Sequence, residues 1–162
     1  NAFVMFNPDK FQWRPFSVNE NIPEHVIVWL LDNQSLTAKL RNKYDDFCVN
    51  VLSQQENNPY QCELKLLNIN KKNTIIVREV ELIGNSQAVV FARSVIPKTP
   101  DTEDILTIGS KPLGEILFND ETIKRGHLEV GKYSNTWARR STFTIEKTKL
   151  LVSEIFLEHL YA

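Results

Sequence analysis

Hydrophobic and polar residues alternate along several segments of the chain, as they do in β-strands that bury one face. The alternation is clearest in residues 75–83, where Ile76, Val80 and Leu82 share one face. Arg78 is in phase with these three residues. Because successive side chains of a strand point to opposite faces, the pattern predicts a guanidinium on the face that packs against the core.

Six segments in all are predicted to form strands. They are residues 46–52, 60–69, 75–83, 88–96, 140–146 and 150–157. Residues 70–73 offer a turn before the third of these strands. Gly84 and Asn85 offer the positive-φ conformations of a hairpin after it.

Helical spacing of apolar residues predicts short helices between and before the strands. The predicted helices are residues 23–31, 35–44, 112–118 and 121–126. The hydroxyl of Ser35 is expected to cap the second helix, and Asp120 the fourth. The polar loop at residues 98–108 is expected to contain a helical turn.

The order of these elements predicts the fold class. Most connections between strands are too short for parallel crossovers, which favours antiparallel pairing. We therefore expect an α+β fold in a single domain that spans residues 1–162, with a six-stranded, mostly antiparallel sheet and helices on one face.

Composition narrows the functional classes. The chain has 162 residues and a net charge of −1, without a basic stripe, so we expect no binding to nucleic acid. No apolar run approaches the length of a membrane span, and no pattern of a signal peptide is present. We expect a cytoplasmic monomer.

The two cysteines, Cys48 and Cys62, predict neither a metal site nor a redox motif. They lack C-x-x-C spacing and have no neighbouring pair of histidines. Two free thiols are the simpler interpretation, and a single disulfide is the alternative. Cys62 alternates in phase with Tyr60 and Leu64, so we expect its thiol to face the core.

Charged residues on apolar faces are the candidate functional residues. Arg78 has a counterpart in Glu154, which is in phase with Val152 and Phe156 in the last predicted strand. Burying either charge costs several kcal/mol unless it is paired. One hypothesis is a structural ion pair between them, and the other is that they lie at opposite ends of a polar ligand.

Two more arginines interrupt apolar segments. Arg93 and Arg139 could line the same cavity, but a position at an edge of the sheet, or a side chain that reaches solvent, is the simpler expectation for both. Residues 109–114, with the sequence GSKPLG, are not a P-loop, but they precede a predicted helix. Their backbone N–H groups could therefore bind an anion.

Six segments together resemble the chorismate lyase family. In chain order they read WLLDNQSLTAKL, IIVREVEL, FARSVIP, KPLGEILF, WARRS and LLVSEIFL. The resemblance extends from about Ile22 to Leu157, and residues 1–20 match poorly. It implies a sheet of six antiparallel strands and a cofactor-independent reaction that converts chorismate to 4-hydroxybenzoate and pyruvate on the way to ubiquinone.

The resemblance also implies a role for each of four residues. Arg78 is expected to bind the ring carboxylate together with the backbone N–H of Leu113. Glu154 is expected near the oxygen at the 4-position, and Leu36 is expected to make a backbone contact at the hydroxyl end. Arg78 and Glu154 would be the catalytic pair. Ala138 stands where the family often has glycine, and the loop at 98–108 is short.

A non-catalytic domain of the same fold, which binds or senses an aromatic carboxylate, is the alternative function. Transcription regulators that contain such a domain have a winged-helix domain before it. The residues before Ile22 are too few for one, so we expect the enzyme.

Overall fold

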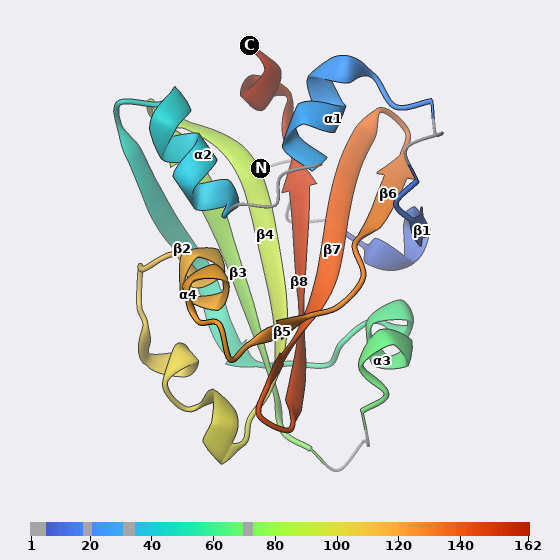
Figure 1. Cartoon of the computed structure of the whole chain (residues 1–162), viewed down its shortest axis with the longest axis vertical. Helices are drawn as coiled ribbons and strands as arrows, with labels where there is room; N and C mark the ends of the chain where they lie inside the picture. The colour runs from blue at the N-terminus through green and yellow to red at the C-terminus, as the bar shows by residue number, and fades with distance from the viewer. Residues whose placement is uncertain (1–5, 18–20, 31–34, 70–72) are drawn as a thin grey trace.

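The computed structural model describes residues 6–17, 21–30, 35–69 and 73–162. Eight strands form one sheet, and every pair of neighbouring strands is antiparallel. The strands are β1 (Gln12–Pro15), β2 (Phe47–Glu56), β3 (Ile75–Gly84), β4 (Gln87–Pro97), β5 (Lys124–Arg125), β6 (Glu129–Tyr133), β7 (Thr136–Ile145) and β8 (Thr148–Phe156). Their order across the sheet is β1-β6-β7-β8-β4-β3-β2, and β5 pairs with β7 (Figure 1).

Four α-helices and four 3-10 helices connect or flank the strands. They are α1 (Glu24–Leu30), α2 (Leu36–Lys43), α3 (Gln61–Leu67), α4 (Leu113–Asn119), η1 (Pro8–Lys10), η2 (Pro100–Thr102), η3 (Ile105–Thr107) and η4 (Glu158–Tyr161). No helix in these described ranges is long and apolar enough to span a membrane.

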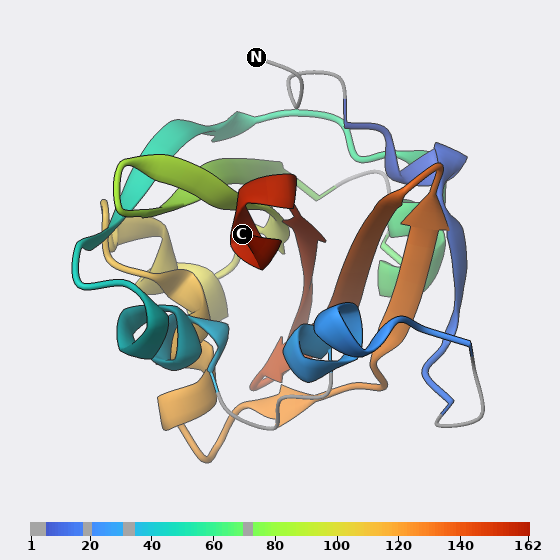
Figure 2. The ribbon, with the colours of Figure 1, turned by 90° about the horizontal axis from the view of Figure 1, so that it is seen from above.

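Helices cover both faces of the sheet (Figure 2). The front face, which carries Val80 of β3 and Phe156 of β8, packs against α1 and α2, and further along against α4. The back face, which carries Val77 and Leu151, packs against α3 through Leu67. The sheet is therefore buried on two sides, and two separate apolar clusters lie on each face.

The structure confirms the α+β class and the antiparallel sheet, but helices lie on both faces and not on one. Five of the six predicted strands are present, and three further strands bring the number in the described residues to eight. The short strands β1, β5 and β6 were not predicted because they contain only 4, 2 and 5 residues. The predicted helix at 121–126 is wrong, since the chain there forms a turn and then β5. The expected helical turn in the loop at 98–108 is present as η2 and η3.

The prediction of a strand at residues 60–69 is wrong, and the helix on the back face was therefore not predicted. Alternation of Tyr60, Cys62 and Leu64 suggests a strand, but the segment forms α3. The carboxylate of Glu63 accepts a hydrogen bond from the backbone N–H of Tyr60 at 2.8 Å, which closes the first turn. Asn68 ends the helix in the left-handed conformation, with φ 49°.

Two expectations about turns and caps also need correction. Ser35 is the N-cap of α2, but its hydroxyl makes no capping hydrogen bond. In the hairpin between β3 and β4, the positive-φ residues are Asn85 and Ser86, with φ 47° and 69°. Gly84 serves a steric purpose instead, because a Cβ atom there would lie 2.4 Å from Cδ2 of Tyr44. The turn predicted at 70–73 lies largely outside the described residues.

Replacing Gly84 by alanine should therefore destabilise the protein. The added methyl group overlaps the Tyr44 ring, and overpacking of this kind costs roughly 1–3 kcal/mol. Urea unfolding of Gly84→Ala measures the loss. Gly114→Ala is the matched control, because a Cβ at Gly114 meets no atom within 4 Å and should leave stability unchanged or higher. Equal stability of the two variants would contradict the steric explanation.

Candidate active site

A pocket lies between the front face of the sheet and the first turns of α2 and α4. Its lining residues are Leu36, Thr37, Val49, Arg78, Val80, Leu82, Ala92, Ser94, Pro112, Leu113, Gly114, Phe118, Val152 and Glu154. All four residues to which the resemblance assigns a role are among them. The walls enclose a cavity of only about 40 Å³, so the pocket is nearly closed.

Arg78 is a buried cation without a carboxylate partner among the residues that the structure describes. Its side chain donates hydrogen bonds to Oε1 of Gln54 at 2.9 Å and to the backbone carbonyls of Gly109 at 2.8 Å and Lys111 at 3.2 Å. All three acceptors are neutral, and no carboxylate of the described residues forms an ion pair with it. Burial consequently lowers the pKa of Arg78.

The loop before α4 is shaped to reach Arg78. Gly109 has a φ of 61°, a conformation that costs glycine little and other residues more. The carbonyl of Gly109 accepts the shorter of the two backbone hydrogen bonds from Arg78. This loop thereby holds the guanidinium without neutralising its charge.

Glu154 pairs with Arg139 and not with Arg78. Nε of Arg139 lies 2.7 Å from Oε1 of Glu154, and 15% of the Glu154 side chain is exposed. The hypothesis of a structural ion pair between Arg78 and Glu154 is therefore wrong. The two residues instead lie separately on the wall of the same pocket.

The strand register sets the separation of Arg78 and Glu154. Arg78 lies opposite Ser94 of β4, whereas Glu154 lies opposite Ala92 of the same strand. The two residues are thus two strands apart and offset by two positions. Standard strand spacings place their Cα atoms about 12 Å apart. Side chains from these positions can contact the two ends of one six-membered ring.

Leu36 and Leu113 face the sheet from the first positions of α2 and α4. The backbone N–H groups in the first turn of a helix have no acceptor within that helix. Leu113 and Gly114 bring two such groups to the pocket, and Leu36 brings another. The pocket therefore contains backbone donors as well as the guanidinium.

The expectation for Arg139 is wrong, because its side chain neither lies at an edge nor reaches solvent. It is 1% exposed, and Nη1 donates to the carbonyls of Trp29 and Leu30 at the end of α1, at 3.0 and 3.3 Å. Its pairing with Glu154 follows from their cross-strand register. That register was not readable from the sequence, because each residue alone looks like an isolated charge.

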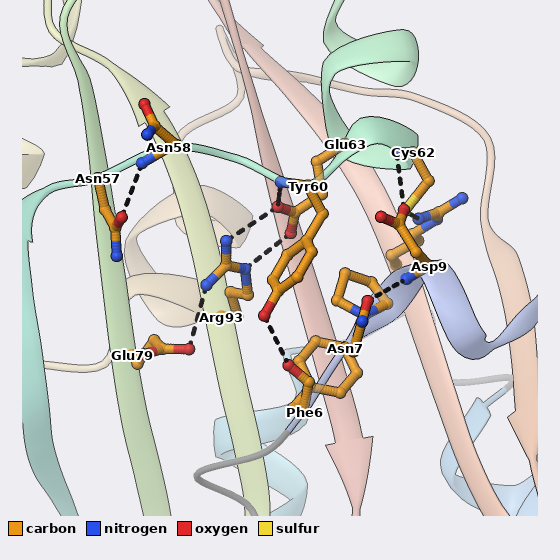
Figure 3. A network of polar contacts seen from close by, with 12 residues as sticks. Phe6, Asn7, Asp9, Asn57, Asn58, Tyr60, Cys62, Glu63, Glu79 and Arg93 are labelled. Atoms are coloured by element: carbon orange, nitrogen blue, oxygen red, sulfur yellow. Dashed lines mark hydrogen bonds and ion pairs between the residues drawn. The ribbon is translucent and has the colours of Figure 1, made fainter.

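Arg93 is also buried, but it lies on the back face (Figure 3). Nε and Nη2 bind both oxygens of Glu63 at 2.8 and 2.9 Å, and Nη1 lies 3.2 Å from Glu79. Tyr60 stacks on the guanidinium at 4.9 Å. Burial alone would lower the pKa of Arg93, but the two carboxylates raise it. Arg93 is a fully paired structural residue.

Cys62 belongs to a second set of hydrogen-bonded polar residues on the back face, together with Asp9 and Arg140. Its backbone N–H donates to Asp9 at 2.9 Å, and Arg140 donates to its sulfur at 3.3 Å. Burial and the hydrogen bond with Asp9 raise the pKa of the Cys62 thiol to about 11. Cys62 is half-buried, Cys48 is exposed, and both thiols are free. Within the described residues, no three His, Cys, Asp or Glu side chains are grouped to hold a metal ion.

The fold and the pocket define the class: a small α+β protein with a nearly closed pocket, whose walls carry a glutamate and an arginine that pairs with no carboxylate of the described residues. The chain matches the chorismate lyase family over residues 7–162. A probable chorismate pyruvate-lyase of Aromatoleum aromaticum is 33% identical, and the match covers 95% of this chain and 96% of that protein.

Two further relatives have the same name. The protein of Pseudoalteromonas atlantica is 34% identical over 82% of this chain and 79% of its own length. That of Pseudomonas putida is 36% identical over 82% of this chain and 81% of its own length. This chain belongs to the chorismate lyase family.

Replacement by methionine should lower the free energy of unfolding much more at Arg93 than at Arg78. Arg93→Met leaves Glu63 buried without its partner, which should cost about 3–5 kcal/mol of unfolding free energy. Arg78→Met leaves only neutral acceptors, two of them on exposed residues, and should lower stability by no more than about 1 kcal/mol. Urea unfolding of both variants tests the contrast. A large loss in Arg78→Met would show that Arg78 is structural.

The two cysteines should react with iodoacetamide at very different rates. The thiolate is the reactive form, and a pKa of about 11 lowers its fraction at pH 8 roughly 100-fold relative to an ordinary thiol. Mass spectrometry of the folded protein should find Cys48 labelled well before Cys62, with labelling of Cys62 rising steeply towards pH 11. In urea the two rates should converge, and equal rates in the folded protein would refute the environment assigned to Cys62.

Proposed function

We propose that this protein converts chorismate to 4-hydroxybenzoate and pyruvate. The observation that supports this proposal is that Arg78 is buried in the same pocket as Glu154 and pairs with no carboxylate in the described part of the chain. A buried guanidinium without a carboxylate partner costs several kcal/mol unless a ligand supplies the charge. Membership of the chorismate lyase family names the acid that would supply it.

The proposed orientation places the ring carboxylate at Arg78. A guanidinium binds a carboxylate with two parallel hydrogen bonds, and the N–H groups of Leu113 and Gly114 add neutral donors at the same end. The ring then lies along the apolar wall formed by Val80 and Ala92. Its 4-position comes next to Glu154, where we assign the contact with the 4-oxygen.

The reaction balances without an additional reagent. The ether bond at C3 breaks and its electron pair leaves with the enolpyruvate oxygen, while C4 loses its proton. The ring becomes aromatic, and the enolpyruvate takes up a proton to become pyruvate. Aromatisation drives the step, so the protein needs mainly to orient the substrate and stabilise charge, and we propose that no cofactor takes part. The product would supply ubiquinone synthesis.

Entry of the substrate requires the pocket to widen. A cavity of about 40 Å³ holds roughly one water molecule, far less than a ring acid. The movable wall is formed by α2 and α4, which an exposed ion pair joins through Arg41 and Glu115 at 2.5 Å. Exposed pairs contribute at most about 1 kcal/mol, so this link opposes opening only weakly.

Purified protein incubated with chorismate should release 4-hydroxybenzoate and pyruvate in equal amounts. Arg78→Met should lower kcat/KM at least about 100-fold, since it removes the bidentate contact with the ring carboxylate. Chromatography of the aromatic product and a coupled assay for pyruvate measure both products. A folded wild-type protein that forms neither product above a blank without enzyme would refute the enzyme and favour the non-catalytic binding domain.

A further inference from the structure

The ion pair between Arg139 and Glu154 has one hydrogen bond, whereas the ion pair between Arg93 and Glu63 has two. In Arg93, Nε and Nη2 bind the two oxygens of Glu63, so one edge of the guanidinium is satisfied. In Arg139, Nε binds Oε1 of Glu154 but Nη2 is buried and has no hydrogen-bond partner. No hydrogen bond to Oε2 of Glu154 is present in the described part of the chain either.

The unused donor lies on the edge of Arg139 that faces Glu154. Nε and Nη2 lie on one edge of the planar guanidinium, so one N–H of Nη2 points in the same direction as the Nε bond to Glu154. Arg139 and Glu154 line a small recess that shares Gly114, Phe118 and Val152 with the main pocket. A donor and an acceptor are therefore left open at the end of the pocket that is distant from Arg78.

Arg139 cannot turn away from this position. Its Nη1 is held by the carbonyls of Trp29 and Leu30, and the side chain is 1% exposed. An unpaired donor on a buried cation costs the full desolvation of that group, so the free Nη2 indicates an absent acceptor. The hydroxyl of Ser141, two residues along β7, is also buried without a partner.

We propose that Nη2 of Arg139 and Oε2 of Glu154 together bind a hydroxyl group of the ligand, the 4-hydroxyl if the proposed function holds. A hydroxyl donates one hydrogen bond and can accept two, so it satisfies both atoms. A second carboxylate would satisfy Nη2 but would be repelled by the charge of Glu154. Arg139 is thus a specificity residue, in addition to holding Glu154 in place.

Three related acids test this inference in the wild-type protein. 4-Hydroxybenzoate can use both atoms, 4-aminobenzoate can donate to Glu154 but is a very poor acceptor for Arg139, and benzoate uses neither. Calorimetric titration should give a Kd for 4-hydroxybenzoate at least about tenfold lower than for 4-aminobenzoate, as a hydrogen bond to a charged group implies. Equal values for these two acids would overturn the inference.

Two variants test whether the preference for 4-hydroxybenzoate over 4-aminobenzoate arises from Arg139. In Arg139→Met the ratio between 4-hydroxybenzoate and 4-aminobenzoate should fall to within about threefold, because the charged donor is lost. Arg93→Met, which removes a buried arginine from the back face, should retain the wild-type ratio. Retention of the ratio in a folded Arg139→Met would also overturn the inference. If that variant does not fold, Arg139→Lys takes its place, because lysine keeps a positive charge beside Glu154 but lacks the second donor of a guanidinium edge, and an unchanged ratio there would overturn the inference.

The same experiments separate this inference from the proposed function. Wild-type protein that forms no products from chorismate and binds none of the three acids refutes the proposed function, and the inference with it. Wild-type protein that forms both products but does not distinguish 4-hydroxybenzoate from 4-aminobenzoate refutes only the assignment of Arg139.

Discussion

The free-energy cost of burying a charged side chain determines how the buried arginines of this structure are paired. Four arginines of the described residues are buried; Arg140 pairs with Glu129, and the other three meet this cost in three different ways. Arg93 on the back face is neutralised by Glu63 and Glu79, and its pKa rises. Arg139 binds Glu154 through Nε only, and its Nη2 has no hydrogen-bond partner among the described residues. Arg78 has neutral acceptors only, and burial lowers its pKa. Among these three, the extent of pairing therefore separates the structural Arg93 from the two arginines at the pocket and its recess.

The antiparallel sheet determines which of these charged side chains lie together at the pocket. Alternation along β3 and β4 sends Arg78 to the front face and Arg93 to the back face, although the two residues lie on neighbouring strands. The continuous register from β3 through β4 to β8 then sets the distance between Arg78 and Glu154. Helices α2 and α4 close the pocket with their first turns. The sheet thus holds the charges, and the first turns of the two helices form the opposite wall of the pocket.

Local sequence patterns predicted the long strands well and the short elements poorly. Strands β3, β4, β7 and β8 contain 10, 11, 10 and 9 residues and either alternate or are almost entirely apolar, so their pattern outweighs local exceptions. The segment at residues 60–69 alternates too, yet capping by Glu63 and Asn68 favours a helix. The carboxylate of Glu63 also pairs with Arg93, a residue 30 positions later, and no local pattern contains that contact.

The sequence by itself determined the fold class, the inward phase of Arg78 and Glu154, and the segments that resemble one enzyme family. Each depends on periodicity or local identity, which a linear chain displays. Only the tertiary structure decided which carboxylate pairs with which arginine. Ion pairs depend on distances of a few ångströms between residues that strand register brings together, and register depends on the whole sheet. For that reason Arg139 looked like an isolated charge in the sequence and is the partner of Glu154 in the fold.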